Sequence, residues 1–243
     1  MPLTPPKTNS AKPYRDSAGA TLTDYPRPSV AVDTAVLTLA PRTSPARNAP
    51  PLRLSVLLVR RLEGVGGPQW ALPGTFLHQG ERLADAVTRS LTQKAGVTGG
   101  RPAQLAVFDD PDRDDRGWVL SVAHLAVIPY AALVDAVFSD QDSPDTVRLA
   151  PVSRPGPLPY DHAAIVRAAT LELRRRYAGR PDPERLLGPR FTIRELRDVH
   201  EAITGKTIQK DTFRRTMEEH VRGTGTLSSG TVGRPSQWFL RAR

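Results

Sequence analysis

The stretch Trp70-Ala-Leu-Pro-Gly-Thr-Phe-Leu-His-Gln-Gly-Glu81, followed by Arg89-Ser-Leu-Thr-Gln-Lys-Ala-Gly-Val97, decides the fold of this chain. Its first part holds the Pro and Gly residues that favour a loop. Residues 82–95 are predicted to form a helix with one buried stripe, because apolar side chains recur at every fourth position. These side chains are Leu83, Val87 and Leu91. Gly96 is then placed to end the helix.

Apolar runs before and after this loop and helix predict the strands of a sheet. The β-branched runs 30–39 and 52–59 are typical of buried strands. Two further strands are predicted at 104–108 and 118–128. Residues Asp161 to Tyr177 are predicted to form a helix, with the aspartate as its N-cap. The sequence therefore predicts a domain in which helices cover a sheet.

Composition limits the class of protein. A chain of 243 residues has room for one large domain and a small one, and a hydrophobic content of 39% suits a globular protein. No apolar run approaches the length of a membrane span, so no membrane partner is expected. Because there are no cysteines, disulfides and thiolate metal sites are excluded. The first residues lack the charged and then apolar order of a secretion signal, so the cytoplasm is the expected compartment.

The net charge of +9 is concentrated near the C-terminus. Residues 186–243 hold 11 Lys and Arg against 6 Asp and Glu, a net charge of +5. Positive charge gathered in a small terminal domain is what binding to a phosphate backbone requires. The alternative is that an arginine-rich chain is simply basic throughout.

Three regions follow from these patterns. Residues 1–28 are rich in Pro, Thr and Ser without a hydrophobic period, which predicts a disordered tail. Residues 29–180 are expected to form the larger domain, and residues 181–243 the smaller one. Residues 178–183, with two prolines and a glycine, are predicted to link them.

The loop and helix at 70–97 resemble the Nudix signature at its full spacing. The family's isolated Glu falls on Glu81, its Arg on Arg89 and its closing Gly-aliphatic pair on Gly96-Val97. Its first Gly is replaced by Thr75. The resemblance implies an α/β fold, the α+β sandwich of Nudix type, with a pocket for a nucleotide-like molecule.

The departures from this signature concern the metal ligands. Three glutamates of the family are replaced by Ser90, Gln93 and Lys94. In active relatives these glutamates bind Mg²⁺, which neutralises a pyrophosphate and activates water. We therefore expect no metal site, no catalytic residues and no required cofactor, but a pocket that senses its ligand. Lys94 either pairs with the ligand's phosphates in place of the metal or is a solvated lysine on an outward helix face.

Seven residues are candidates for binding the effector, and two neighbouring segments bear on them. The candidates are Arg60, Trp70, Gly74, Glu81, Arg89, Lys94 and Arg116. For Glu81 and Arg89 the alternative is an ion pair that only fixes the loop against the helix. The acidic run 109–117 is predicted to be an exposed, solvated loop, although it resembles a segment of Nudix-related regulators that borders the pocket. Residues 158–162 resemble the entry to their last helix, and His162 is assigned no chemistry.

The C-terminal region has the pattern of a winged helix-turn-helix. Thr192 and Glu195 form a capping box, and Gly205 is placed to end the first helix. A second helix is predicted from about Gln209, with a buried stripe at Phe213, Met217 and Val221. Its first turns would enter the major groove of DNA. Candidate readers are Gln209, Lys210, Thr212, Arg214 and Arg215, and Arg234 in the predicted wing is a candidate for a phosphate or minor-groove contact.

Residues 191–240 resemble the DNA-binding end of Nudix-related regulators of NAD metabolism, the NrtR-type repressors. The matching pieces include Lys210, Phe213-Arg-Arg215 and Gly233-Arg-Pro235. Asp211-Thr212 stand where the family usually has Arg-Asn, so a different operator preference is expected. The resemblance implies a homodimer on a palindromic operator in double-stranded DNA, repression of NAD synthesis or salvage genes, and ADP-ribose or a related nucleotide as effector.

Three rival functions are weighed against this one. The first is an ADP-ribose pyrophosphatase with a rearranged metal site. The second is a bifunctional regulator that keeps slow hydrolysis. The third is a nucleotide-binding module whose basic end grips RNA or a partner protein.

Overall fold

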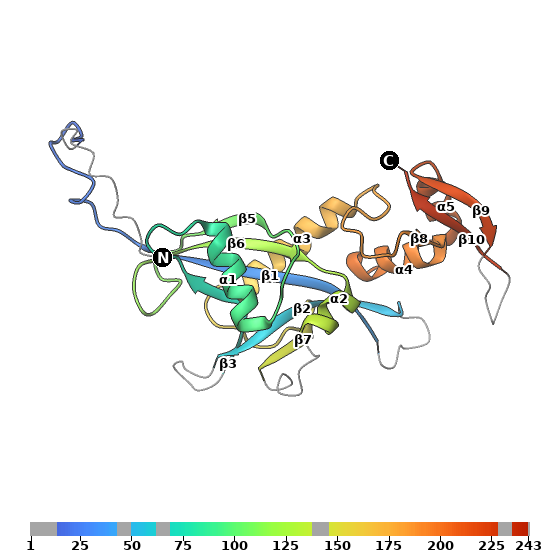
Figure 1. Ribbon diagram of the computed structural model, residues 1–243, viewed down its shortest axis with the longest axis horizontal. Helices are drawn as coiled ribbons and strands as arrows, with labels where there is room; N and C mark the ends of the chain where they lie inside the picture. Colours follow the sequence, from blue (N-terminus) through green and yellow to red (C-terminus); the bar gives the residue numbers. More distant parts are fainter. Residues whose placement is uncertain (1–13, 43–49, 62–68, 138–145, 228–234, 243) are drawn as a thin grey trace, which may run out of the picture.

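The computed structural model describes residues 14–42, 50–61, 69–137, 146–227 and 235–242. Figure 1 shows a large sheet with helices on its faces in the middle of the molecule and a smaller unit at the C-terminal end. The predicted sandwich of sheet and helices is confirmed, and so is the winged helix that follows it.

The large sheet is built around its first strand. Its strands are β1 (Ser29–Pro41), β2 (Leu52–Arg61), β3 (Gln69–Ala71), β4 (Gly74–Phe76), β5 (Ala103–Phe108), β6 (Val119–Val127) and β7 (Val147–Pro151). Strand β1 pairs parallel with β6 and antiparallel with β2 and β4. The sequence predicted the four longer strands β1, β2, β5 and β6, whereas β3, β4 and β7 were not predicted because they are too short to show a pattern.

Side chains of β1 are buried on both faces of the sheet. Leu37 and Leu39 belong to an apolar core covered by α3 (His162–Tyr177). Val32 and Val36 belong to a second core, on the side of α1 (Leu83–Ala95) and α2 (Tyr130–Val137). Because successive strand residues point to opposite faces, an uninterrupted apolar run is what a strand between two helical layers requires.

The ends of the helices test the local predictions. Gly96 follows α1 with a φ of 63°, the left-handed conformation that ends a helix, as predicted. Asp161 does precede α3, but its side chain makes no capping hydrogen bond, so that part of the prediction is wrong. The carboxylate binds Arg113 instead.

The loop 109–117 was predicted to be exposed, and this is only partly correct. Arg113 and Asp114 are buried, with 8% and 5% of their surfaces exposed. Arg113, at the centre of the loop, turns inward and binds Asp161 at the start of α3, so the acidic loop is anchored at its centre.

The winged helix has its own small core. It consists of β8 (Arg190–Phe191), α4 (Ile193–Thr204), α5 (Lys210–Glu218), β9 (Val221–Leu227) and β10 (Gln237–Arg241). The Thr192 capping box is present, and Gly205 ends α4 with a φ of 71°. Phe213 and Met217 are buried with Phe191, Leu196 and Phe239. The predicted stripe is wrong at Val221, because α5 ends earlier and this residue begins β9, half-buried.

The first helix of the winged helix also packs on the large sheet. Val199 and Ile203 of α4 are buried in the same core as Leu37, Leu54 and Leu173 of the larger domain. Residues 178–183 therefore connect two units that share a core, rather than two units joined only by a linker.

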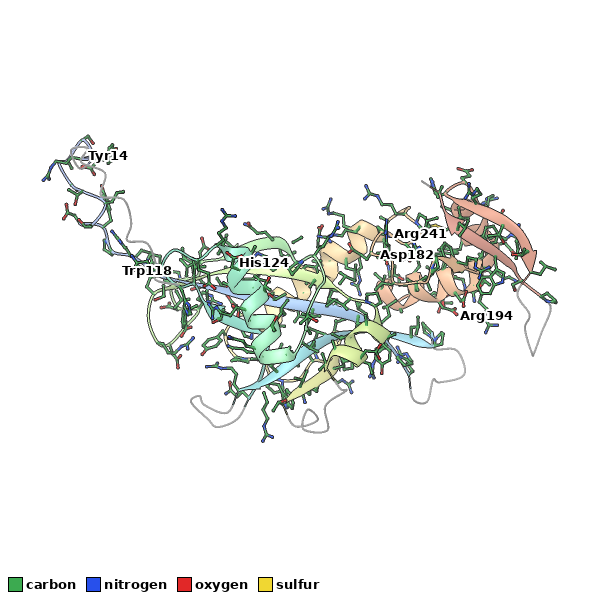
Figure 2. All side chains as sticks on the ribbon, in the orientation of Figure 1. Tyr14, Trp118, His124, Asp182, Arg194 and Arg241 are labelled. Atoms are coloured by element: carbon green, nitrogen blue, oxygen red, sulfur yellow. The ribbon has the colours of Figure 1, made fainter. Side chains whose placement is uncertain are left out.

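A buried carboxylate ties the junction together. The side chain of Asp182 is fully buried and accepts hydrogen bonds from the Tyr177 hydroxyl at 2.7 Å and from the N–H groups of Leu186 and Leu187 at 2.9 and 3.0 Å. Arg241 of β10 forms an ion pair with it at 2.6 Å. Figure 2 shows Asp182 and Arg241 at this junction. Burial and the nearby Asp182 charge raise the pKa of Tyr177 well above its usual range, so its hydroxyl stays a donor.

No helix in the described part of the chain is long and apolar enough to cross a membrane.

Truncation of Ile203 tests the shared core. Ile203 is fully buried, so Ile203→Ala should destabilise the protein by about 3 kcal/mol through lost contacts with both units. Arg194→Ala, an exposed position on the same helix, should change stability by less than about 0.5 kcal/mol. Urea unfolding followed by tryptophan fluorescence measures both. A cost below about 1 kcal/mol for Ile203→Ala would contradict the packing described.

Candidate functional site

A polar cavity of about 640 Å³ opens where β1 and β2 meet the β4 loop, α1, the loop 109–117 and the start of α3. Cationic side chains surround it, and two carboxylates lie among them. The charged residues and ring-bearing polar residues that line it are Asp33, Arg60, Arg61, Lys94, Arg113, Asp114, Arg116, Tyr160 and His162. Segments distant in the sequence are thus brought to one cavity by the sheet.

Asp33 and His162 form a buried pair in this cavity. The Asp33 carboxylate accepts a hydrogen bond from the Ser121 hydroxyl at 2.6 Å and lies 3.3 Å from His162 Nε2. His162 Nδ1 accepts from the N–H of Leu72 at 3.1 Å, so a proton of the neutral ring sits on Nε2 and points to Asp33. Burial raises the pKa of Asp33, but the hydrogen bonds from His162 and Ser121 and the nearby Arg113 charge outweigh burial and lower it. Asp33 is therefore ionised.

Arg113 joins the loop 109–117 to α3 beside this pair. Its guanidinium makes two hydrogen bonds to Asp161, at 2.8 and 2.7 Å, and lies 3.5 Å from Asp33. Paired hydrogen bonds of this kind fix both position and orientation. A displacement of the loop would consequently also shift the first turn of α3.

Arg61 and Arg116 lie against the aromatic rings at the cavity. Arg61 donates a hydrogen bond to the Tyr160 hydroxyl at 2.8 Å and lies 5.2 Å from the ring centre. Arg116 lies 5.2 Å from the centres of both the Tyr160 and Phe76 rings, and it pairs with Asp114 at 2.6 Å. Guanidinium groups held in this way are ordered before an anionic ligand arrives.

Lys94 extends the positive charge to α1. Lys94 is exposed as a residue, but its ammonium group is partly enclosed at the cavity, where it donates a hydrogen bond to the Gly74 carbonyl. Burial of the ammonium group is the main cause that lowers the pKa of Lys94, followed by the charge of Arg61. A second positive group close by disfavours the charged lysine, and a bound anion would relieve this repulsion. Of the two interpretations of Lys94, the geometry favours the one that puts it at the ligand.

The seven predicted ligand residues do not all reach the cavity. Arg60, Gly74, Lys94 and Arg116 line it. Trp70 is not among the lining residues, and Arg148 lies 4.5 Å from its ring centre.

Glu81 and Arg89 are not among the lining residues either, and they bind each other through two hydrogen bonds of 2.8 Å. Arg89 also donates to the Thr75 hydroxyl and the Phe76 carbonyl. The geometry therefore favours the alternative role for this pair, bracing the loop against α1.

The pocket residues missed by the sequence analysis are Asp33, Arg61, Arg113, Asp114, Tyr160 and His162. In the sequence, Asp33 is a lone carboxylate within an apolar strand. Nothing in the sequence indicates that Arg113 is buried at the centre of an acidic loop. Residues 158–162 did carry one, through their resemblance to the entry of the last Nudix helix, but His162 was left without a role.

The donors at the former metal position do not fit a divalent cation. Ser90 is buried and its hydroxyl has no partner, whereas Gln93 and Lys94 face the cavity. Within the ranges that the structure covers, no group of three or more His, Asp or Glu side chains could hold a metal ion. A hard cation requires several oxygen ligands, and an ammonium group nearby opposes it.

The second candidate site is the exposed surface of α5. Lys210, Thr212 and Arg215 are exposed near the start and on the outer side of this helix. Arg214 is paired with Glu218 at 2.7 Å, so it contributes less free charge. The Gln209 side-chain oxygen accepts from the N–H of Thr212 at 2.5 Å, which makes Gln209 the N-cap of α5. Arg234 lies outside the described residues.

These two sites together define a class of protein. A sheet-and-helix domain with a cationic pocket is joined through a shared core to a winged helix with an exposed basic helix, the architecture of a ligand-responsive transcription factor. Comparisons with known proteins identify the family.

Residues 183–240 match the model of the NrtR DNA-binding winged helix domain. An ADPR responsive transcriptional repressor of Acinetobacter baylyi is 30% identical over 219 residues, covering 89% of this chain and 83% of the relative. The crystal structure of Shewanella oneidensis NrtR with a 27mer DNA aligns with a TM-score of 0.68 and 29% identity, covering 88% of this chain and 93% of that one. The chain belongs to the NrtR family.

A further relative is an enzyme. The ADP-ribose pyrophosphatase of Methanocaldococcus jannaschii is 34% identical over 70 residues, which are 29% of this chain and 41% of the enzyme. This partial likeness agrees with the Nudix-type fold of the larger domain.

Gly74 is predicted to be essential to the shape of the cavity. A Cβ at this position would overlap the Asp33 carboxylate and lie 2.9 Å from the Val32 carbonyl, both held in the central strand. Gly74→Ala should therefore lower stability by about 2 kcal/mol or more. Gly188→Ala is the matched control, because its nearest contact, at 3.7 Å, is an ordinary one. Equal melting temperatures for the two variants would contradict the close approach of β4 to Asp33.

The Glu81–Arg89 pair predicts a stability effect at acid pH. Hydrogen bonding from Arg89, and then from the His78 N–H, lowers the pKa of Glu81 from 4.5 to about 2. The ionised carboxylate therefore stabilises the fold fully above pH 4.5, and this contribution is lost as the pH falls toward 2. The stability difference between wild type and Glu81→Gln should shrink across this window in thermal unfolding. If the stability difference between wild type and Glu81→Gln does not change with pH, the ionised carboxylate of Glu81 contributes nothing to the stability of the fold.

Proposed function

We propose that this protein is a DNA-binding transcriptional repressor whose pocket senses ADP-ribose or a related nucleotide. It would act in the cytoplasm as a homodimer on a palindromic operator beside genes of NAD synthesis or salvage. The observation that carries the proposal is the cationic cavity in a domain that shares its core with a winged helix. The Acinetobacter relative, described as responsive to ADPR, supports this effector.

The chemistry of the cavity suits a nucleoside diphosphate sugar. ADP-ribose carries two phosphate charges, which Arg61, Lys94 and Arg116 are positioned to neutralise. Its ribose hydroxyls need acceptors, and the ionised Asp33 carboxylate supplies one inside the same cavity. Mixed recognition of this kind disfavours ligands that are merely anionic.

We further propose that the protein senses this ligand without cleaving it. Ser90, Gln93 and Lys94 stand where the Nudix signature has three glutamates, and their shortage of oxygen ligands together with the positive charge of Lys94 supports this proposal. A hydrolase needs both the metal and an activated water. The pocket would then bind the diphosphate and keep it intact.

Helix α3 is the proposed route from the pocket to DNA. Its first residue, His162, lies in the pocket, and its last, Tyr177, lies 5.2 Å from the ring of His200 in α4. His200 in turn lies 5.0 Å from Phe213, on the buried side of α5. A small shift of α3 would reorient the helix that carries Lys210 and Arg215.

The proposed regulation is thermodynamic linkage. The ligand must bind one arrangement of the two winged helices better than another, since a ligand with equal affinity for both changes nothing. In the dimer, only one arrangement would match major grooves about 34–36 Å apart, or a multiple of that distance.

Replacement of Lys94 tests the effector site. Lys94→Glu should weaken ADP-ribose binding about ten-fold or more, because one phosphate contact becomes a repulsion. Thr88→Glu places a glutamate at an exposed position elsewhere on α1, and it should leave the affinity unchanged. Calorimetry gives the affinities, and fluorescence anisotropy shows whether ADP-ribose alters binding to the operator beside the protein's own gene. Unchanged affinity in Lys94→Glu would remove Lys94 from the site.

The rival enzyme function has a direct assay. Incubation with ADP-ribose and Mg²⁺ or Mn²⁺ should give no AMP at ordinary enzyme rates, while operator DNA is bound. Brisk AMP release without DNA binding would replace the repressor by a pyrophosphatase, which the Methanocaldococcus likeness makes the strongest alternative. Slow release together with DNA binding would indicate the bifunctional regulator.

A further inference from the structure

Residues 14–28 form an arm that is organised by its own hydrogen bonds. The Asp16 carboxylate accepts from the N–H groups of Ala18 and Ala20, each at 2.9 Å, and from the Tyr25 hydroxyl. Every hydrogen bond that the structure gives to this segment joins two of its own residues. Within the described ranges the arm is thus held by its own hydrogen bonds, and residues 1–13 of the predicted tail lie outside the described residues.

Large apolar side chains of this arm are exposed. The exposed fractions are 70% for Tyr14, 68% for Leu22 and 50% for Tyr25. Figure 1 shows the arm projecting from the end of the molecule opposite the winged helix. Figure 2 shows Tyr14 far out on the arm. Exposed apolar groups on an ordered segment are typical of a surface that binds a partner, and the arm lies at the opposite end of the molecule from the winged helix (Figure 1).

A groove of matching character lies at the base of the arm. It is a cavity of about 610 Å³ lined by Pro111, Asp112, Asp114, Asp115, Gly117 and Trp118. Trp118 is 49% exposed, and its carbonyl accepts from the N–H of Ser29, where the arm leaves the body. The groove is thus both acidic and aromatic.

Arm and groove carry complementary unpaired charges. Asp16 and Asp24 of the arm bind its own N–H groups, whereas Arg15 and Arg27 donate to backbone carbonyls, at Gly19 and Leu22. In the described ranges these two arginines form no ion pair. The same is true of Asp112 and Asp115 in the groove. The arm thus offers two cations beside tyrosines, and the groove offers two carboxylates beside a tryptophan. These charges are complementary.

We propose that the arm of one protomer docks in this groove of a second copy of the chain, which rests on the homodimer of the proposed function. Pro26 and Pro28 restrict the backbone of the connection to β1, and none of the arm's hydrogen bonds in the described ranges reaches its own groove. Asp114 lines both the groove and the cationic cavity and binds Arg116 in the latter. The arm of each protomer therefore adjoins the effector pocket of the other.

Engineered cysteines test the exchange, because the chain has none of its own. Leu22→Cys chains are mixed with Asp115→Cys chains that carry a size tag, and the pair is oxidised mildly. We expect a disulfide between tagged and untagged chains on a non-reducing gel. Arg222→Cys, an exposed position in the winged helix, replaces Asp115→Cys as the control and should give no such band.

Other outcomes would overturn the exchange. A double variant Leu22→Cys/Asp115→Cys that forms only an intrachain disulfide would place the arm in its own groove. If light scattering shows a dimer but no disulfide forms between residues 22 and 115, the docking is refuted. The proposed function is tested separately on the same chains, by operator binding and its response to ADP-ribose. A monomer that still binds its operator would refute the homodimer and the arm exchange together.

Charge reversal supplies a second measurement. Arg15→Glu/Arg27→Glu should weaken dimerisation by at least about five-fold, because the exposed ion pairs of both arms are lost and replaced by repulsions. Mixing these chains with Asp112→Arg/Asp115→Arg chains should restore both arm contacts, and with them most of the affinity. The reversed arm then meets the reversed groove, and the unchanged arm meets the unchanged groove. Equal dimer affinity in all combinations would contradict the docking.

Discussion

The packing of α4 on the large sheet is the constraint on which the rest of this structure depends. Ile203 and Val199 are buried with residues of β1, β2 and α3, so the first helix of the winged helix completes the core of the larger domain. Asp182 adds a buried charge at the same junction, bound to α3 and β10. Two units that share a core move as one body or repack together, because close-packed interiors do not deform continuously.

That constraint gives the pocket its proposed influence on DNA. The pocket residue His162 begins α3, and the far end of the helix, at Tyr177, touches α4 through His200. The effector would act on Arg113 and Asp33, which are bonded or close to the first turn of the same helix. In the proposed function, the arginines and Lys94 at the cavity supply the positive charge that meets the phosphates of the ligand.

The sequence was a good guide where a local pattern determines local structure. The helix at 83–95, its glycine stop, the long strands and the Thr192 capping box all follow from periodicity or cap chemistry, and all are confirmed. The pocket residues were predicted less well from the sequence, because they are distant in the chain and come together only through the sheet. Asp33 and His162 lie far apart in the chain, and the two arginines Arg89 and Arg113 differ in role only through which carboxylates the fold brings to them. The shared core could not be inferred at all, since an amphipathic α4 is equally consistent with packing inside the winged helix alone.

Amide hydrogen exchange of the full-length protein, with and without ADP-ribose, tests the central claim most directly. Exchange reports local opening along the backbone, so it shows how far the effect of a ligand spreads. If α3 and α4 connect the pocket to DNA, the ligand will change the protection of amides near Tyr177, in α4 and in α5, as well as around the pocket. Altered operator affinity with changes confined to the pocket residues would contradict this route.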